Sequence, residues 1–282
     1  MAQKILILGA QGMLGQALNK VFVDKNPILW DLSELDITDK EEVEKKLKKL
    51  KPTLILNASG FTDVDGAETN ETKAMAVNGQ AVGYLAPVAK ALGAIIVHYS
   101  TDYVFAGERK EGYKEDDIPN PISVYGKSKL LGEKLLQEKG EMYYLIRSSW
   151  MFGEFGLKNF VKKILTKAAK EGSLKVVNDH FGKPTYAKDL AGQTRKIIEE
   201  MKPCGIYHVT NETKAGGITW YDLAKLAIEI KGLNCQVVPC GAEEFPQPAK
   251  RPKYAALINT KLPPTRDWQE ALADYLKNLN IE

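Results

Sequence analysis

The chain has 282 residues, of which 39 are basic and 36 acidic, so its formal net charge is only +3. A balance this close to neutral gives no reason to expect nucleic acid as a partner. Its apolar stretches fall short of the roughly 20 residues that cross a membrane, and its start lacks the pattern of a secretion signal. The three cysteines have no metal-ligand spacing and are typical of free thiols in a reducing compartment. We therefore expect a cytoplasmic protein with no membrane partner.

Short apolar segments alternate with amphipathic segments along the first half of the chain. This alternation predicts a doubly wound, parallel α/β sheet of the Rossmann type, because strands covered by helices on both faces are apolar throughout. The predicted strands are residues 4–8, 28–30, 53–57, 94–100 and 143–147, and the predicted helices are residues 14–23, 40–50, 77–92 and 123–138. We interpret residues 1–150 as a dinucleotide-binding domain.

The pattern is less regular after Trp150. Helices at 159–170 and 220–230 and a strand near 175–177 are expected, with proline- and glycine-containing loops between them. We interpret residues 151–282 mainly as a smaller substrate-binding region that covers the cofactor cleft. Part of it, residues 206–209, is expected to return to the main sheet.

A glycine-rich loop joins the first predicted strand to the first predicted helix. Residues 9–15 read Gly-Ala-Gln-Gly-Met-Leu-Gly. Glycine permits a tight turn and close approach of the backbone to a pyrophosphate, and the helix N-terminus supplies free amides. Such a loop can also be a turn without a ligand, but its position between strand and helix favours a dinucleotide site. The predicted cofactor contacts here are Gly9, Gln11, Gly12, Met13, Leu14 and Gly15.

Asp31 directly follows the second predicted strand. In a dinucleotide-binding fold, an acid at this place binds the adenine-ribose hydroxyls and disfavours a 2′-phosphate. Asp36 and Asp39 could lie near the adenine, although Thr38 or Asp39 could simply cap the helix that follows. We expect NADH to be usable and leave NADPH open.

Tyr125 and Lys129 are four residues apart at the start of a predicted helix, so both side chains lie on one face. A free tyrosine has a pKa near ~10, and a neighbouring ammonium would lower that pKa. Tyr125 could then give a proton to a carbonyl oxygen as a hydride reaches the carbon. The spacing occurs by chance in many helices, so it indicates a catalytic pair only in combination with the other motifs.

These motifs together resemble the extended short-chain dehydrogenase/reductases. Longer segments resemble the dTDP-4-dehydrorhamnose reductases within that superfamily: Ser-Thr-Asp-Tyr-Val-Phe from residue 100, Pro-Ile-Ser-Val-Tyr-Gly-Lys-Ser-Lys from 121, Arg-Ser-Ser-Trp from 147, Phe-Gly-Lys-Pro-Thr from 181 and Pro-Ala-Lys-Arg-Pro from 248. Sugar-nucleotide dehydratases carry a glutamate where this chain has Tyr103, and epimerases usually have a serine-rich stretch there. The resemblance spans nearly the whole chain.

The resemblance implies NAD(P)H-dependent reduction of the 4-keto group of dTDP-4-dehydro-β-L-rhamnose, the last step of dTDP-rhamnose biosynthesis for polysaccharides. It implies that Thr101 hydrogen-bonds the keto oxygen and that Tyr125 donates the proton. Lys129 is expected to lower the tyrosine pKa and to hold the nicotinamide ribose. Each role is physically reasonable, since negative charge develops on that oxygen as the hydride arrives.

Further contacts are carried over from the resemblance. Asn57, Ala58, Ser59 and Asn78 are expected along the cofactor. Asp102 and Tyr103 are expected to touch the sugar, and Trp150 to pack on the hexose, although a tryptophan there could also plug the core.

Asn159 and Arg251 are further candidates for substrate binding. Asn159 could equally cap a helix. Arg251 could meet the nucleotide diphosphate, since guanidinium suits phosphate, or form a surface ion pair.

Two positions depart from the family pattern. Some members bind Mg²⁺ through glutamates at a dimer interface, where this chain has Ala17 and Lys188. Neither side chain can ligate Mg²⁺, so we predict no such metal site, and any homodimer would form without it.

Two other functions remain open from the sequence. One is a non-catalytic dinucleotide-binding protein resembling the regulatory subunit of methionine adenosyltransferase, which lacks a tryptophan at the position of Trp150. The other is a reductase of a different nucleotide-linked 4-keto sugar, because loops that contact the nucleotide vary.

Overall fold

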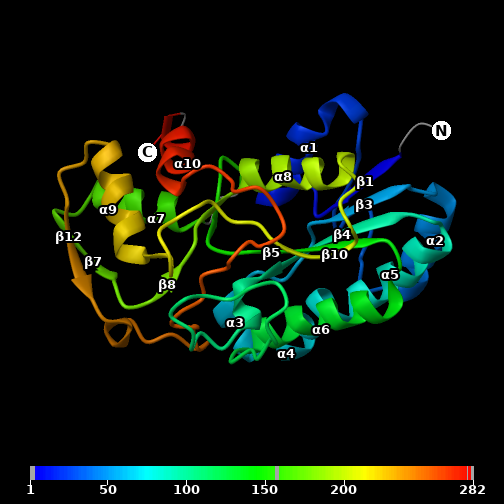
Figure 1. Ribbon diagram of the computed structural model, residues 1–282, viewed down its shortest axis with the longest axis horizontal. Coiled ribbons are helices and arrows are strands. Elements are labelled where there is room, and N and C mark those ends of the chain that lie inside the picture. Colours follow the sequence, from blue (N-terminus) through cyan, green and yellow to red (C-terminus); the bar gives the residue numbers. More distant parts are fainter. Residues whose placement is uncertain (1–3, 156–158, 278, 281–282) are drawn as a thin grey trace.

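Six parallel strands form the central sheet, in the order β10-β5-β4-β3-β1-β2 (Figure 1). The computed structural model describes residues 4–155, 159–277 and 279–280. The strands are β1 (Ile5–Leu8), β2 (Ile28–Trp30), β3 (Leu54–Asn57), β4 (Ile95–Thr101), β5 (Tyr143–Ser148) and β10 (Gly205–His208). The predicted α/β fold is confirmed. The expected return of residues 206–209 is also confirmed, since β10 pairs with β5.

Helices cover both faces of this sheet, as the apolar strands require. Alternate strand residues pack on opposite sides: Ile5 and Ile7 belong to one buried cluster, and Leu6 to the other. The helices on the first side are α1 (Met13–Val21) and α8 (Ala187–Glu199), and those on the second side include α2 (Lys40–Leu50), α5 (Ala81–Ala91) and α6 (Val124–Lys139) (Figure 1). Of these, α8 was not predicted from the sequence.

The helix predicted at 77–92 differs in its first turn. Two short helices, α3 (Val64–Thr69) and α4 (Glu71–Met75), lead into a π-helical turn at Ala76–Gln80, and α5 follows. The π turn faces α6, where a Cβ added to Gly132 would lie 2.2 Å from the carbonyl oxygen of Asn78. Glycine therefore lets the two backbones meet at this point.

The second half of the chain builds a separate apolar cluster beside the sheet (Figure 1). Its elements are α7 (Phe160–Ala168), α9 (Trp220–Ile230), α10 (Trp268–Lys277), and the parallel pair β7 (Ser173–Val177) and β12 (Gln236–Cys240). There are two further short pairs: β6 (Met151–Phe152) with β9 (Thr185–Tyr186), and β8 (Phe181–Gly182) with β11 (Ile218–Thr219). Along the chain, each of these strands lies between a strand of the central sheet and an element of this cluster. The predicted helices and the strand are confirmed within a few residues at their ends.

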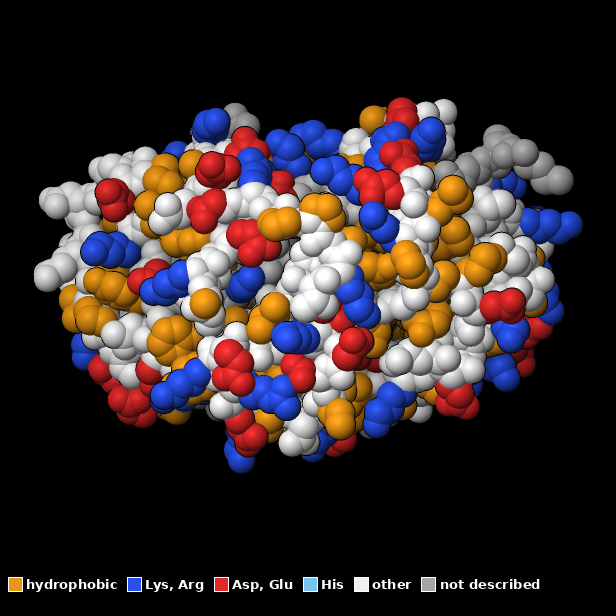
Figure 2. Space-filling model, in the orientation of Figure 1, with side chains coloured by type: hydrophobic (Ala, Val, Ile, Leu, Met, Phe, Trp, Pro, Cys, Tyr) orange, Lys and Arg blue, Asp and Glu red, His pale blue; other side chains and the backbone are white. Residues whose placement is uncertain are grey.

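The surface fits the near-neutral composition. Figure 2 shows basic and acidic side chains interspersed over the face in view, with hydrophobic side chains between them. Within the described residues, no helix combines the length and apolar character that crossing a membrane requires.

A buried ion pair ties α6 to the sheet. Arg147, in β5, places its Nη2 2.7 Å and its Nε 3.0 Å from the two carboxylate oxygens of Glu133 in α6. Ser100, in β4, donates its hydroxyl to the same carboxylate at 2.5 Å. Both charged side chains are almost fully buried, so each depends on the other for its charge to be tolerated.

Removing one partner of this pair should lower the stability of the fold far more than removing both. We expect Glu133→Leu to lower the free energy of unfolding by about 3–5 kcal/mol, because a buried guanidinium is left unpaired. Glu133→Leu with Arg147→Met should recover much of the loss. Urea unfolding followed by circular dichroism measures both, and a double variant no more stable than the single one would contradict the explanation.

Candidate active site

A cavity of about 1460 Å³ opens at the carboxyl ends of the central strands. Cavities for single small ligands are typically about 300–1,000 Å³, so this one has room for a dinucleotide and a second ligand. Its wall comes from the loops after β1, β3 and β4, from the ends of β2 and β5, and from α6 and α9. It lies where the chain order turns from β1 outward to β2 and back to β3, the usual ligand position in such sheets.

The glycine loop forms one end of the cavity. Gly9 has a φ of 71°, and a Cβ there would lie 2.7 Å from the amide nitrogen of Ser59. Gly12 precedes α1 without a side-chain cap on the helix, so first-turn amides face the cavity region without a side-chain partner. Gly15 has another role, since its Cβ would lie 2.1 Å from the Gly9 oxygen. This glycine lets α1 start directly against the loop.

Asp31 stands at the end of β2 and lines the same part of the cavity. One carboxylate oxygen accepts a hydrogen bond from the Gln11 amide at 2.9 Å, and the other accepts from the Leu32 amide at 2.9 Å. Asp36 lines the cavity nearby, whereas Asp39 caps α2 by accepting from the Glu42 amide. Two carboxylates at this end favour ribose hydroxyls over a phosphate.

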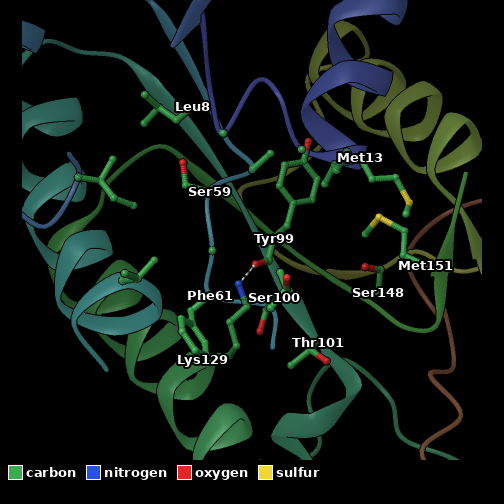
Figure 3. Close-up of a pocket in the computed structure, with 18 of the residues that line it drawn as sticks. Leu8, Met13, Ser59, Phe61, Tyr99, Ser100, Thr101, Lys129, Ser148 and Met151 are labelled. Carbon is green, nitrogen blue, oxygen red and sulfur yellow. Dashed lines mark hydrogen bonds between the residues drawn. The ribbon is translucent and has the colours of Figure 1, made fainter. Parts of the chain in front are cut away.

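Tyr125, Lys129 and Thr101 meet deeper in the cavity. Ser123 caps α6 by accepting from the Gly126 amide, which places Tyr125 in the first turn and Lys129 one turn later. The Lys129 ammonium donates to the backbone oxygen of Tyr99 at 2.6 Å (Figure 3). Thr101 ends β4 and donates its hydroxyl to the Asp102 carboxylate at 2.9 Å.

Burial controls the ionisation of this group. The pKa of Tyr125 is raised to about 12, mainly by burial and in part by the Asp102 carboxylate, whereas a hydrogen bond with Thr101 opposes the rise. Burial also lowers the pKa of Lys129 to about 8, although the nearby Glu133 carboxylate acts to raise it. The pKa of Tyr125 is therefore raised and not lowered as expected, because the loss of hydration outweighs any stabilisation of the phenolate by the ammonium.

Asp102 carries a buried carboxylate oxygen without a partner. Oδ1 accepts from Thr101, whereas Oδ2 has no hydrogen-bond partner among the described residues. Burial raises the pKa of this carboxyl group to about 7. Asp102 lines the cavity, but Oδ2 itself is buried, so a ligand hydroxyl could reach it only if the neighbouring groups move.

Most residues predicted for the site line this one cavity. They are Gly9, Gln11, Gly12, Met13, Leu14, Asp31, Asp36, Ala58, Ser59, Thr101, Asp102, Tyr103, Tyr125, Lys129 and Trp150. Five predicted contacts lie outside the lining: Gly15, Asn57, Asn78, Asn159 and Arg251.

Asn57 and Asn78 support the lining from behind. Asn78 is buried and accepts from the Phe61 amide while donating to the Phe61 oxygen and to Ser128. It thereby fixes the backbone after β3, which does line the cavity. Asn57 pairs its amide with the ring of His98.

Asn159 and Arg251 have their polar groups engaged elsewhere. Asn159 caps α7 by accepting from the Lys162 amide, and it donates to Gly153 and Tyr275. Arg251 forms a bidentate ion pair with Asp65 of α3, both bonds at 2.6 Å. For both residues the structure shows the simpler of the two roles considered from the sequence.

Several lining residues were not predicted. Tyr99 and Ser148 lie near the ends of β4 and β5, and Phe61 and Met151 follow β3 and β5 closely, so their place at strand ends was a usable signal (Figure 3). Trp220 comes from α9, more than a hundred residues away in sequence from β4. No motif in the sequence pointed to it.

Comparisons with known proteins agree with this site. The family model described as "RmlD substrate binding domain" matches residues 3–281. A dTDP-4-dehydrorhamnose reductase of Aggregatibacter actinomycetemcomitans is 40% identical, over 95% of this chain and 97% of its own. The chain belongs to the dTDP-4-dehydrorhamnose reductase family.

Solved structures in the family superpose closely. A dTDP-4-dehydrorhamnose reductase of Clostridium acetobutylicum has a TM-score of 0.93 at 40% identity, covering 98% of this chain and 99% of its own. That of Bacillus anthracis, in complex with NADP, has a TM-score of 0.94 at 32% identity, covering 99% and 100%.

The two departures from the family pattern have ordinary structural roles. Ala17 is buried in the cluster that α1 shares with the sheet, and Lys188 lies 3.1 Å from Asp274. The absence of an Mg²⁺ site at these positions stays a prediction.

Asp31 should control the choice between NADH and NADPH. We expect Asp31→Ala to raise the ratio of kcat/KM for NADPH to that for NADH by roughly tenfold, about 1.4 kcal/mol, because a carboxylate beside the ribose repels a 2′-phosphate. The ratio is the measurement, since loss of the Gln11 hydrogen bond affects both cofactors. Glu41→Ala, on the exposed side of α2, is the control; an equal ratio in both variants would exclude the role.

Asp102 should make stability depend on pH. Its pKa of about 7 lies above the ordinary value of 3.8, so the folded state holds a proton that the unfolded state releases, and stability falls as pH rises from about 4 to 7. Asp102→Asn should therefore be more stable than the parent at pH 8, by at most about 4 kcal/mol, and equal near pH 4.

Thermal unfolding at the two pH values measures this difference. Asp116→Asn, at an exposed acid of the same region, is the control and should show no such gain. Parallel pH profiles for the parent and Asp102→Asn would contradict the assignment.

Proposed function

We propose that the protein reduces the 4-keto group of dTDP-4-dehydro-β-L-rhamnose to give dTDP-β-L-rhamnose, using NADPH or NADH. The observation that carries the proposal is the convergence of Thr101, Tyr125 and Lys129 in one cavity with the glycine loop. The full-length family match supports the same reaction. The reaction would be the last step in making a sugar donor for polysaccharides, and its placement in the cytoplasm rests on sequence pattern alone.

The cavity fits a nicotinamide dinucleotide. Gly9 and the uncapped start of α1 would hold the pyrophosphate, and Asp31 the adenine ribose. The Lys129 ammonium would reach the nicotinamide ribose. When bound, the dihydronicotinamide supplies the hydride that reaches C4 of the sugar.

Tyr125 supplies the proton. Its raised pKa keeps the phenol protonated at neutral pH, which is the form that a reduction needs. The proton would move from the phenol oxygen to the keto oxygen as the hydride arrives. The Thr101 hydroxyl, which donates to the Asp102 carboxylate in this structure, would turn to donate a hydrogen bond to that oxygen. Lys129, still largely a cation near neutral pH, then stabilises the phenolate left behind.

The sugar would lie between the strand ends and the second half of the chain. Asp102 and Tyr103 would meet its hydroxyls, and Trp150 lines the same cavity. Arg251 would meet the diphosphate with its guanidinium already paired to Asp65. We assign cofactor binding to residues 1–150, which also carry the sugar contacts named above, and the substrate-binding role of residues 151–282 stays a prediction.

The regulatory-subunit alternative is less well supported. Trp150, which separates the two groups in sequence, lies in the cavity wall beside the predicted catalytic residues. No single contact distinguishes one nucleotide-linked 4-keto sugar from another, so the named sugar follows the relatives.

Tyr125→Phe tests the proposal. With dTDP-4-dehydro-6-deoxyglucose, a 3,5-epimerase and NADH or NADPH, the parent should oxidise the cofactor, and the variant should lose about 10²–10⁴-fold in kcat because its proton donor is gone. Tyr84→Phe, in α5 and outside the cavity, is the matched control. A parent that binds dinucleotide yet gives no epimerase-dependent turnover would refute the assigned reaction.

A further inference from the structure

Both faces of the Trp150 indole are covered. Trp220 stacks on it with ring centroids 3.6 Å apart and an interplanar angle of 14°. A Cβ added to Gly182 would lie 2.6 Å from Cε2 of Trp150, closer than to the flanking Cζ2 and Nε1, so Gly182 sits over a ring face and not at an edge. Since Trp220 fills one face, Gly182 covers the other. A hexose that stacks on Trp150 therefore has to displace Trp220 or meet Gly182 near Cε2.

Trp220 is held rigidly at the start of α9. Thr219 and Asp222 form a reciprocal capping box around it, with bonds of 2.9 and 3.1 Å. On its other side the ring of Phe160 packs against it, with centroids 4.6 Å apart. Phe160 does not line the cavity, whereas Trp220 does. The indole is thus supported from outside the cavity and exposes part of its surface to it.

The backbone at Trp150 supports the same view. Its φ of 45° lies in the left-handed region, which is uncommon for a bulky residue and carries strain. The stack between Trp220 and Gly182 keeps the indole in this position. The two stacked indoles therefore hold each other in place.

We propose that Trp220 is a specificity-determining residue that contacts the hexose of the nucleotide sugar, with Trp150 positioning its indole. This inference rests on the proposed function and adds a residue from the second half of the chain to it. The carbon-bound hydrogens and the methyl group of a 6-deoxyhexose are apolar, and an indole offers them a dry, rigid surface. The nucleotide alone makes no such contact.

The test compares binding of dTDP-β-L-rhamnose with binding of dTDP by calorimetry. Trp220→Ala should raise the Kd for dTDP-β-L-rhamnose relative to the Kd for dTDP by roughly tenfold. The variant should bind dTDP and NADH with affinities within about twofold of those of the parent. Trp220→Leu, which keeps an apolar side chain, serves if the alanine variant does not fold. Tyr221→Ala, at the next residue and outside the cavity lining, is the matched control.

A ratio unchanged in both Trp220 variants would overturn the proposal. A second readout is the exciton signal of the stacked indoles in circular dichroism, which Trp150→Phe and Trp220→Phe should each abolish. Dinucleotide and dTDP-β-L-rhamnose should leave that signal intact in the parent. Its loss on sugar binding would mean that the hexose displaces Trp220 and stacks on Trp150, which contradicts the proposal.

Failure of this inference is distinguishable from failure of the proposed function. If only the inference fails, the parent still turns over the keto sugar and the Trp220 variants bind like it. If the parent neither turns over the keto sugar nor binds dTDP-β-L-rhamnose, the assigned reaction is refuted, and the proposed role of Trp220 is refuted with it.

Discussion

The buried ion pair between Glu133 and Arg147 is the contact on which the site depends. It joins α6 to β5, and through Ser100 to β4, directly before Thr101. Tyr125 and Lys129 lie two turns and one turn earlier on the same helix, so this tie sets their depth and rotation relative to the strand ends. A buried pair adds little net stability by itself. Its effect here is to specify one arrangement of helix and sheet.

Close backbone contact completes that arrangement. A Cβ at Gly126 would lie 2.2 Å from the backbone oxygen of Tyr103, and a Cβ at Gly132 would lie 2.2 Å from the backbone oxygen of Asn78. The helix can therefore approach both the loop after β4 and the π turn before α5. In this way one helix brings the phenol and the ammonium to the end of the strand that carries Thr101.

The depth of the site then decides its proton chemistry. Taking Tyr125, Lys129 and Asp102 out of water favours the neutral form of each. For the phenol this is the proton-carrying form, suited to reduction. A sequence argument based on one neighbouring charge gave the opposite direction, because it could not weigh the loss of hydration against the ammonium.

The residues that sequence reasoning located correctly share one property. Gly9, Ser59 and Thr101 each follow a strand closely, and strand ends in a parallel sheet converge at one edge. The two substrate-binding candidates that lie outside the cavity lining, Arg251 and Asn159, have partners far away in the chain. Arg251 meets Asp65, and Asn159 meets Tyr275, through contacts that depend on how the second half folds against the first half and on itself.

By itself, then, the sequence determined the α/β class, the glycine loop, the order of strands and helices in the first half, and the motif that carries the family. These follow from local periodicity and from residue types that a turn or a motif requires. The tertiary structure alone decided the stack of Trp150 on Trp220, the ion pair of Glu133 with Arg147 and the direction of the tyrosine pKa. Each of these depends on burial and on contacts between distant segments, which local sequence patterns do not encode.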